Sequence, residues 1–241
     1  AVRDDRIGLE EALMAHGADA GQLDSNGRTL LCAAKSAEMA ELLLRRGANP
    51  HIRDAHNDGP LEYAIEEGQT DLASTLIDQG VRPTFFALAA LGHEEQVVTQ
   101  LREEPDLIRT FRTMPGSGSP QPGDDAEVEV PLGSWGGTAL HFAAKAGSLR
   151  MVRLLLDHGA MVNAATNPAK WTPLHDATYY SIRRDLPDGE SIIRELVAAG
   201  ADSKARTWGG YRALDIADYL SFDEPSARIF DLLAQLAANK E

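Results

Sequence analysis

The feature that most constrains the fold is an apolar pair followed three residues later by a glycine, which occurs five times. Two of these glycines, Gly47 and Gly80, are 33 residues apart, a period typical of stacked structural repeats. Glycine adopts the left-handed conformation that ends a helix at low steric cost, so each occurrence predicts a helix C-terminus. The five occurrences are Leu13-Met14…Gly17, Leu43-Leu44…Gly47, Leu76-Ile77…Gly80, Leu155-Leu156…Gly159 and Leu196-Val197…Gly200.

A second motif precedes this one in the same register. Gly137-Thr138-Ala139-Leu140-His141 comes before the helix that ends at Gly159, and Thr172-Pro173-Leu174-His175-Asp176-Ala177 repeats the pattern in the next unit. In both motifs and their spacing the chain resembles the ankyrin repeat over nearly its whole length. The resemblance implies an all-α repeat solenoid: an ankyrin-like stack of helix-turn-helix units with hairpin fingers, about five full repeats plus an N-terminal half-repeat.

The residue types give the stack a physical basis. Alanines on the short helix of each unit allow two layers of helices to approach closely, and the leucine pairs form an apolar stripe on the longer helix. A single unit has nothing against which to bury that stripe, so we expect one core that continues from unit to unit.

Irregular spacing between the helix ends predicts how the single repeat domain, residues 1–241, is divided. Pro105 takes the place of a helix-ending glycine only 25 residues after Gly80, too soon for a full hairpin finger. We also expect the extra residues 182–189 to form a loop between the two helices of the fifth repeat. The predicted parts are an N-terminal half-repeat (1–23), two repeats (24–81), a degenerate repeat (82–112), a loop insertion (113–134), and three repeats including the C-terminal cap (135–241).

Composition narrows the possible functions. The net charge of −14 argues against a nucleic-acid binder, which normally presents a basic face, and fits a basic protein partner. The only cysteine, Cys32, excludes a disulfide framework, so we expect a cytoplasmic protein, and no apolar run is long enough to cross a membrane. We expect a monomer when the chain is free.

No motif for catalysis, metal binding or a cofactor is present, and we expect no cofactor and no metal. His51, Asp54, His56 and Asp58 lie close together in sequence, but Asp54 belongs to the expected turn of one finger, where it serves local hydrogen bonding. In the ankyrin family the histidine of the Thr-x-Leu-His motif hydrogen-bonds to backbone and ties neighbouring fingers together. The resemblance therefore implies a structural role for His141 and His175.

Aromatic residues gather in the positions that vary between ankyrin repeats, namely the finger tip and the end of the short inner helix. Binding hot spots are enriched in Trp, Tyr and Arg because a rigid ring buries a large area at little entropic cost. The alternative is that each ring packs on its neighbouring finger. The predicted binding residues are Trp135, Lys145, Trp171, Asp176, Tyr179, Tyr180, Trp208, Tyr211 and Tyr219, together with Glu66 and Glu67 from the N-terminal half.

Two classes of function follow. The first is a protein–protein interaction module that binds a partner with basic patches across its concave face, as an adaptor, an inhibitor or an immunity-type protein. The second is a small-molecule-binding protein or an enzyme that uses an aromatic groove under the 113–134 loop. In that case Asp215 is of interest as an acid or base, because it takes the place of the histidine of the earlier repeats. An enclosed pocket with a carboxylate at its floor would favour the second class.

Overall fold

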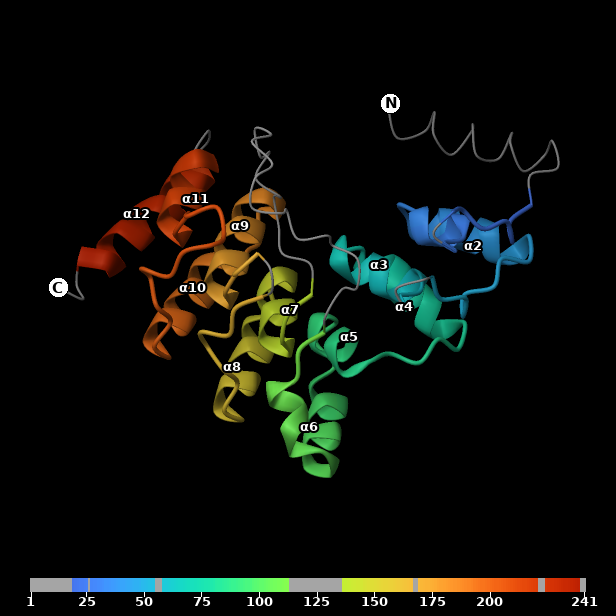
Figure 1. Cartoon of the computed structure of the whole chain (residues 1–241), viewed down its shortest axis with the longest axis horizontal. Helices are drawn as coiled ribbons and strands as arrows, with labels where there is room; N and C mark the ends of the chain where they lie inside the picture. Colours follow the sequence, from blue (N-terminus) through green and yellow to red (C-terminus); the bar gives the residue numbers. More distant parts are fainter. Residues whose placement is uncertain are drawn as a thin grey trace. The chain divides into compact units, whose positions relative to one another are not determined.

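The structure is a computed structural model that describes residues 19–25, 27–54, 58–112, 136–166, 169–220 and 224–238. Residues 1–18 of the predicted half-repeat, the 113–134 insertion, His56 and Trp135 therefore lie outside the described residues. Within these ranges the chain forms eleven α-helices, two 3-10 helices and no strands (Figure 1). The all-α ankyrin-like fold is confirmed.

The chain divides into two compact units, which are described separately. Unit 1 is residues 1–83, and its described helices form two helical layers. One layer pairs the short helices η1 and α3, and the other pairs the longer helices α2 and α4. The bounds are η1 Leu30–Ala33, α2 Ala37–Arg45, α3 Pro60–Glu66 and α4 Thr70–Asp78.

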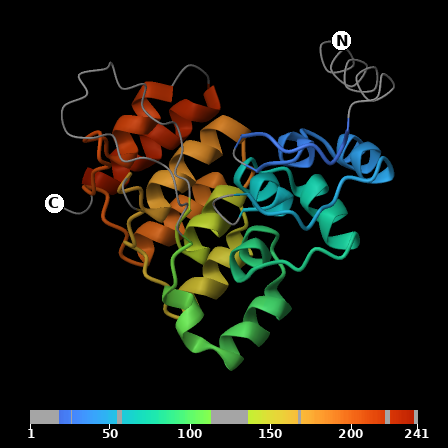
Figure 2. The same ribbon diagram turned by 45° about the vertical axis from the view of Figure 1, so that its right-hand side comes forward.

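Unit 2 is residues 84–241 and repeats the same arrangement. The inner helices α5, α7, α9 and α11 pack side by side in that order, and each also packs on the outer helix that follows it (Figure 1, Figure 2). The bounds are α5 Phe85–Ala90, α6 Glu94–Glu103, η2 Pro105–Arg109, α7 Ala139–Ala146, α8 Leu149–Asp157, α9 Pro173–Arg184, α10 Gly189–Ala198, α11 Ala213–Leu220 and α12 Glu224–Ala238.

The apolar pair and its glycine form one local motif. Gly159 has φ of 82°, and its N–H donates to the Leu156 carbonyl while the next N–H, of Ala160, donates to the Leu155 carbonyl. This is the Schellman arrangement, which satisfies the last carbonyls of a helix. The same pair of bonds ends the helices at Gly47, Gly80 and Gly200. The predicted helix ends at these four glycines are confirmed.

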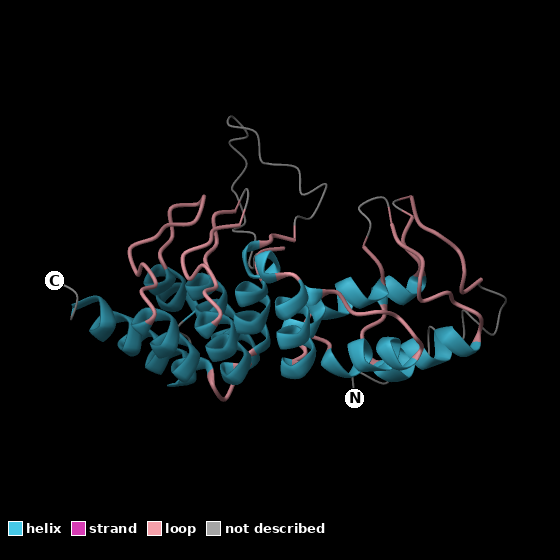
Figure 3. Cartoon of the chain, turned by 90° about the horizontal axis from the view of Figure 1, so that it is seen from below, coloured by secondary structure: helices cyan, strands magenta, loops and turns pink. Residues whose placement is uncertain are grey.

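The leucine stripes bury between layers, as expected for a stack. Leu155 of α8, Leu140 of α7 and Leu196 of α10 are completely buried in one cluster that runs through unit 2. Buried alanines, among them Ala143 and Ala177, separate neighbouring inner helices. Figure 3 shows that, within unit 2, the loops leading from an outer helix to the next inner helix project to one side of the helices.

The prediction of a loop at residues 182–189 is wrong in part. Helix α9 continues through Ile182 and Arg183 to Arg184 and ends only at Asp185, which has φ of 48°. The next helix, α10, already begins at Gly189. About half of the extra sequence thus lengthens the inner helix by a turn, since α9 has 12 residues and α7 has 8.

Candidate binding surface

The fingers of unit 2 are fixed by buried histidines at the start of the inner helices. The Thr138 N–H donates to Nδ1 of His141 over 3.0 Å, and the Thr138 hydroxyl lies 2.9 Å from the same nitrogen. Nδ1 is therefore the acceptor, which leaves the proton on Nε2 to be donated to the Trp171 carbonyl of the following finger, 3.1 Å away. One neutral side chain thus caps its own helix and holds the next finger.

His175 repeats this network one unit later. The Thr172 N–H lies 3.1 Å from its Nδ1, and its Nε2 lies 3.2 Å from the Tyr211 carbonyl. Burial lowers the pKa of His141 to about 3 and that of His175 to about 4, because the charged imidazolium would lose its hydration. The structural role predicted for both histidines is confirmed.

Asp215 caps the start of α11, as the two histidines cap the starts of their helices. Its Oδ2 accepts the Arg212 N–H at 2.8 Å, and its Oδ1 lies 2.7 Å from Nη2 of the Arg212 guanidinium. Hydrogen bonding to Arg212 lowers the pKa of the Asp215 carboxyl below its ordinary value. A carboxylate stabilised in this way is a weak proton acceptor, so its geometry is that of a helix cap.

An aromatic cluster lies outside the main core of unit 2, where a finger meets two inner helices. Trp171 and Tyr179 are only 3% and 6% exposed, and their rings meet edge to face at 5.7 Å. Tyr180 stands edge to face with Tyr179 at 5.0 Å, while Ile216 of α11 completes the buried set. These rings join the finger to α9 and α11, and they stiffen the surface above them.

Cationic side chains lie on the rings of neighbouring inner helices. Lys145, which is 2% exposed, places Nζ 5.1 Å from the Phe142 ring centroid and 5.8 Å from that of Tyr180. The Arg184 guanidinium lies 4.4 Å from the Tyr180 ring and also donates to the Lys145 carbonyl. Sequence reasoning missed Arg184, although its position four residues after Tyr180 on one helix was the available signal.

Three predicted aromatic residues are exposed. Trp208 and Tyr211 belong to the finger between α10 and α11 and are 47% and 38% exposed, and Tyr219, near the end of α11, is 63% exposed. The Trp208 N–H donates to the Ala169 carbonyl of the preceding finger, which holds the backbone under the exposed ring. These rings offer apolar area to a partner without first unfolding the chain.

The acidic residues of the predicted set occupy different environments. Asp176 is completely buried in α9. Glu66 and Glu67 belong to unit 1, where Glu66 is buried and Glu67 lies 3.7 Å from Lys35 Nζ. Within unit 2, ring and cation contacts join Trp171, Tyr179, Tyr180 and Lys145, and hydrogen bonds hold the finger of Trp208 and Tyr211 against the preceding repeat. Asp176 lies on α9 and Tyr219 on α11, whereas Glu66 and Glu67 lie in unit 1.

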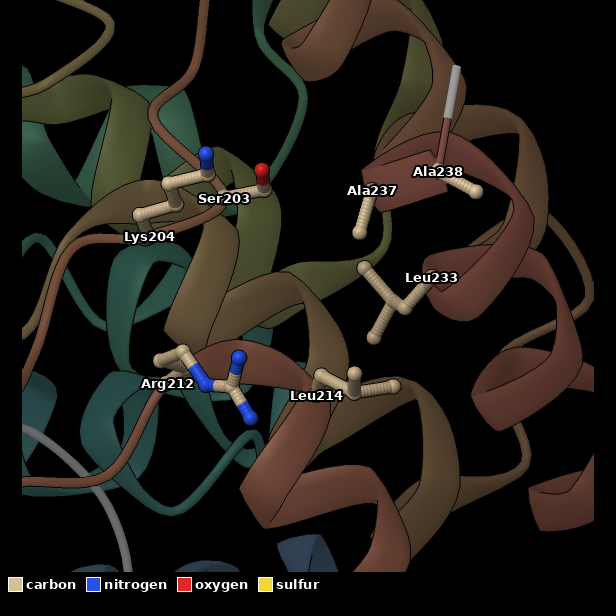
Figure 4. Close-up of a pocket in the computed structure, with 7 residues that line it drawn as sticks. All are labelled: Ser203, Lys204, Arg212, Leu214, Leu233, Ala237 and Ala238. Atoms are coloured by element: carbon tan, nitrogen blue, oxygen red, sulfur yellow. The ribbon is translucent and has the colours of Figure 1, made fainter. Parts of the chain in front are cut away.

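Two cavities occur away from the aromatic cluster. One, of about 150 Å³, lies between the last finger, the start of α11 and the end of α12, and Figure 4 shows Lys204 and Arg212 on one side of it and Leu233 on the other. The second, of about 290 Å³, belongs to unit 1 and is lined by His51 and Glu62 among others. Neither cavity is lined by the rings that the small-molecule hypothesis requires.

Comparison with known proteins agrees with this architecture. The family "Ankyrin repeats (3 copies)" matches residues 1–87 and 85–207. The chain belongs to the ankyrin repeat family, whose repeats bind other proteins. No helix among the described residues is both long and apolar enough to cross a membrane.

Curated relatives share the repeats but are longer. The rat protein "Ankyrin repeat and SAM domain-containing protein 6" is 26% identical over 73% of this chain and 18% of its own length. The Drosophila "NF-kappa-B inhibitor cactus" is 27% identical over 56% of this chain and 24% of its length. The mouse "B-cell lymphoma 3 protein homolog" is 30% identical over 69% of this chain and 34% of its length. The chain therefore spans about a third or less of these relatives.

Proposed function

We propose that this chain is a protein-binding module, acting as an adaptor, an inhibitor or an immunity-type protein, that contacts its partner through the finger side of unit 2. The observation that carries the proposal is the group of exposed aromatic rings on a finger whose backbone is held at two points by the preceding repeat. One relative is named an inhibitor, which supports the second of the three roles.

The predicted site residues divide into two roles under this proposal. Trp208, Tyr211 and Tyr219 are the direct contacts, because exposed rings on a rigid support lose little entropy on binding. The buried members, such as Trp171 and Tyr179, shape the surface beneath them. Trp135 is also proposed as a contact, although it lies outside the described residues.

The proposed partner carries basic residues opposite the end of α11. The chain has a net charge of −14, and Asp218, next to Tyr219, is exposed. Complementary charge mainly accelerates encounter and selects among partners. We further propose that residues 1–241 form one repeat domain with the divisions given above, and that the protein is a cytoplasmic monomer when free.

The test is a quantitative pull-down from a lysate of the source organism with three tagged full-length chains. The wild type is compared with the double variant Trp208→Ala/Tyr219→Ala and with Arg194→Ala, a control on the exposed side of outer helix α10. We expect a protein retained by the wild type and the control and lost from the double variant. Equal recovery by all three chains would show that the exposed rings do not contact the partner.

A further inference from the structure

The connection that follows α4, the last helix of unit 1, is too short to form a finger. The segments that lead from an outer helix to the next inner helix span residues 46–59, 158–172 and 199–212, whereas the segment between α4 and α5 is only 79–84. The finger that ends with α3 at Pro60 is therefore not followed, within unit 1, by a second finger. Among the described residues of unit 1, no finger therefore covers the surface that a second finger would face.

Two consecutive fingers of unit 2 show the contacts that a finger normally makes with the next one. Asn163, four residues after Gly159, donates from Nδ2 to the Gly200 carbonyl at 3.0 Å and accepts the Asp202 N–H at 2.8 Å. One side chain thus joins one finger to the start of the next. In the same register, His51 stands four residues after Gly47.

The corresponding positions in unit 1 stay apart. Gly80 and Arg82 are in the register of Gly200 and Asp202, but among the described residues no hydrogen bond joins them to the His51 side chain. Instead, a cavity of about 290 Å³ lies between them. We call this cavity the finger gap; its lining residues are Pro50, His51, Arg53, Gly59, Glu62, Gly80, Val81 and Arg82.

A cavity also occurs at the corresponding position of the last finger of unit 2. There Ser203, Lys204 and Arg212, in the register of Pro50, His51 and Gly59, line the smaller cavity of Figure 4. Within the described residues no further finger follows α12. Both cavities thus occur where, among the described residues of its own unit, a finger is not followed by another.

Glu62 gives the finger gap an unsatisfied hydrogen-bond acceptor. Its side chain is buried, and Oε2 accepts the Gly59 N–H at 3.0 Å. Oε1 is also buried and forms an ion pair with Arg53 Nη1 at 3.3 Å, but it accepts no hydrogen bond from any described residue. His141, in the same position of its repeat, uses its second polar atom to hold the following finger.

The rim of the finger gap is basic. His51, Arg53 and Arg82 are exposed around the buried Glu62. Arg53 lies against Glu62, whereas no carboxylate of the described residues pairs with Arg82. The cavity therefore offers a cation at its rim, and a buried acceptor lies beneath Arg53, which suits a segment with a carboxylate and a backbone N–H.

We propose that the finger gap binds an acidic loop of a partner protein, which takes the place of the missing finger. An Asp or Glu side chain of the loop pairs with Arg82 beside His51, and a backbone N–H of the loop takes the place of the Arg53 guanidinium and donates to Oε1 of Glu62. This contact lies entirely in unit 1, so it is independent of the aromatic surface of unit 2.

The test is a titration of the ¹⁵N-labelled full chain, followed by NMR, with the blocked peptide acetyl-Gly-Asp-Gly-amide. We expect saturable shifts of the Gly59, Gly80 and Arg82 amide signals. The peptide acetyl-Gly-Asn-Gly-amide should not produce them. Arg82→Gln should weaken binding at least about tenfold, because a charge-assisted pair is lost.

Arg46→Gln, at the exposed end of α2, is the matched control and should bind as the wild type does. Trp208→Ala/Tyr219→Ala should also leave this titration unchanged, which separates it from the function proposed for unit 2. Absence of saturable shifts, equal shifts with the Asn peptide, or equal affinity in Arg82→Gln would overturn the proposal.

Discussion

The buried histidines make the stability of unit 2 dependent on pH in a way that can be calculated. Both have a lower pKa in the folded chain, about 3 for His141 and about 4 for His175, than the ordinary value of 6.5. The unfolded chain therefore binds more protons below pH 6.5, and stability falls as the pH drops toward the folded values. Between pH 7 and pH 5, where the folded histidines stay neutral, each costs about 2 kcal/mol.

The assay is urea unfolding, followed by tryptophan fluorescence, of the wild type and of His141→Gln/His175→Gln. Glutamine does not titrate, so the double variant should be less stable at pH 7 but should lose less stability on going to pH 5. The free-energy difference between the two chains should shrink by about 4 kcal/mol, while changes from carboxyl groups cancel in the comparison. Parallel pH dependence in both chains would refute the assignment of buried, neutral histidines.

Three further changes test the packing. Gly189→Ala should cost about 1–3 kcal/mol in thermal unfolding, because the new Cβ would overlap the Ser181 hydroxyl, and an unchanged melting temperature would contradict that close approach. Ser181→Ala should be neutral or slightly stabilising in the same assay, since its buried hydroxyl has no hydrogen-bond partner among the described residues. Leu155→Ala, at a completely buried site in α8, should cost about 2–5 kcal/mol in urea unfolding, and a loss below about 1 kcal/mol would argue against a tightly packed stack.

Local patterns predicted the parts of the fold that local chemistry determines. A leucine pair before glycine supplies two carbonyls and one left-handed residue, which are all that the helix end at Gly159 requires. The role of His141 was predictable for a similar reason, since its cap bonds reach only to Thr138. The family pattern supplied the longer contact to Trp171.

Features that depend on long-range packing could not be predicted in the same way. Trp171 and Trp208 occupy corresponding positions of their repeats, so both were predicted to contact a partner. In the structure Trp171 is buried with Ile216 of the next repeat, whereas Trp208 is half exposed. The extension of α9 was missed because Asp185, a residue other than glycine, takes the left-handed conformation that ends it. The 25-residue step after Gly80 predicted an incomplete finger, but it did not predict the cavity between His51 and Arg82, which depends on how these segments pack.

The central claim is that exposed rings of unit 2 bind a partner protein. The most direct measurement is calorimetric titration of the partner recovered by the wild-type chain against the wild type, Trp208→Ala/Tyr219→Ala and Arg194→Ala. We predict a simple integer stoichiometry and an affinity at least about tenfold lower for the double variant, since each hot-spot ring contributes about 1–2 kcal/mol or more. An affinity within about twofold of the wild type in a folded double variant, which is far less than 1 kcal/mol, would contradict the claim.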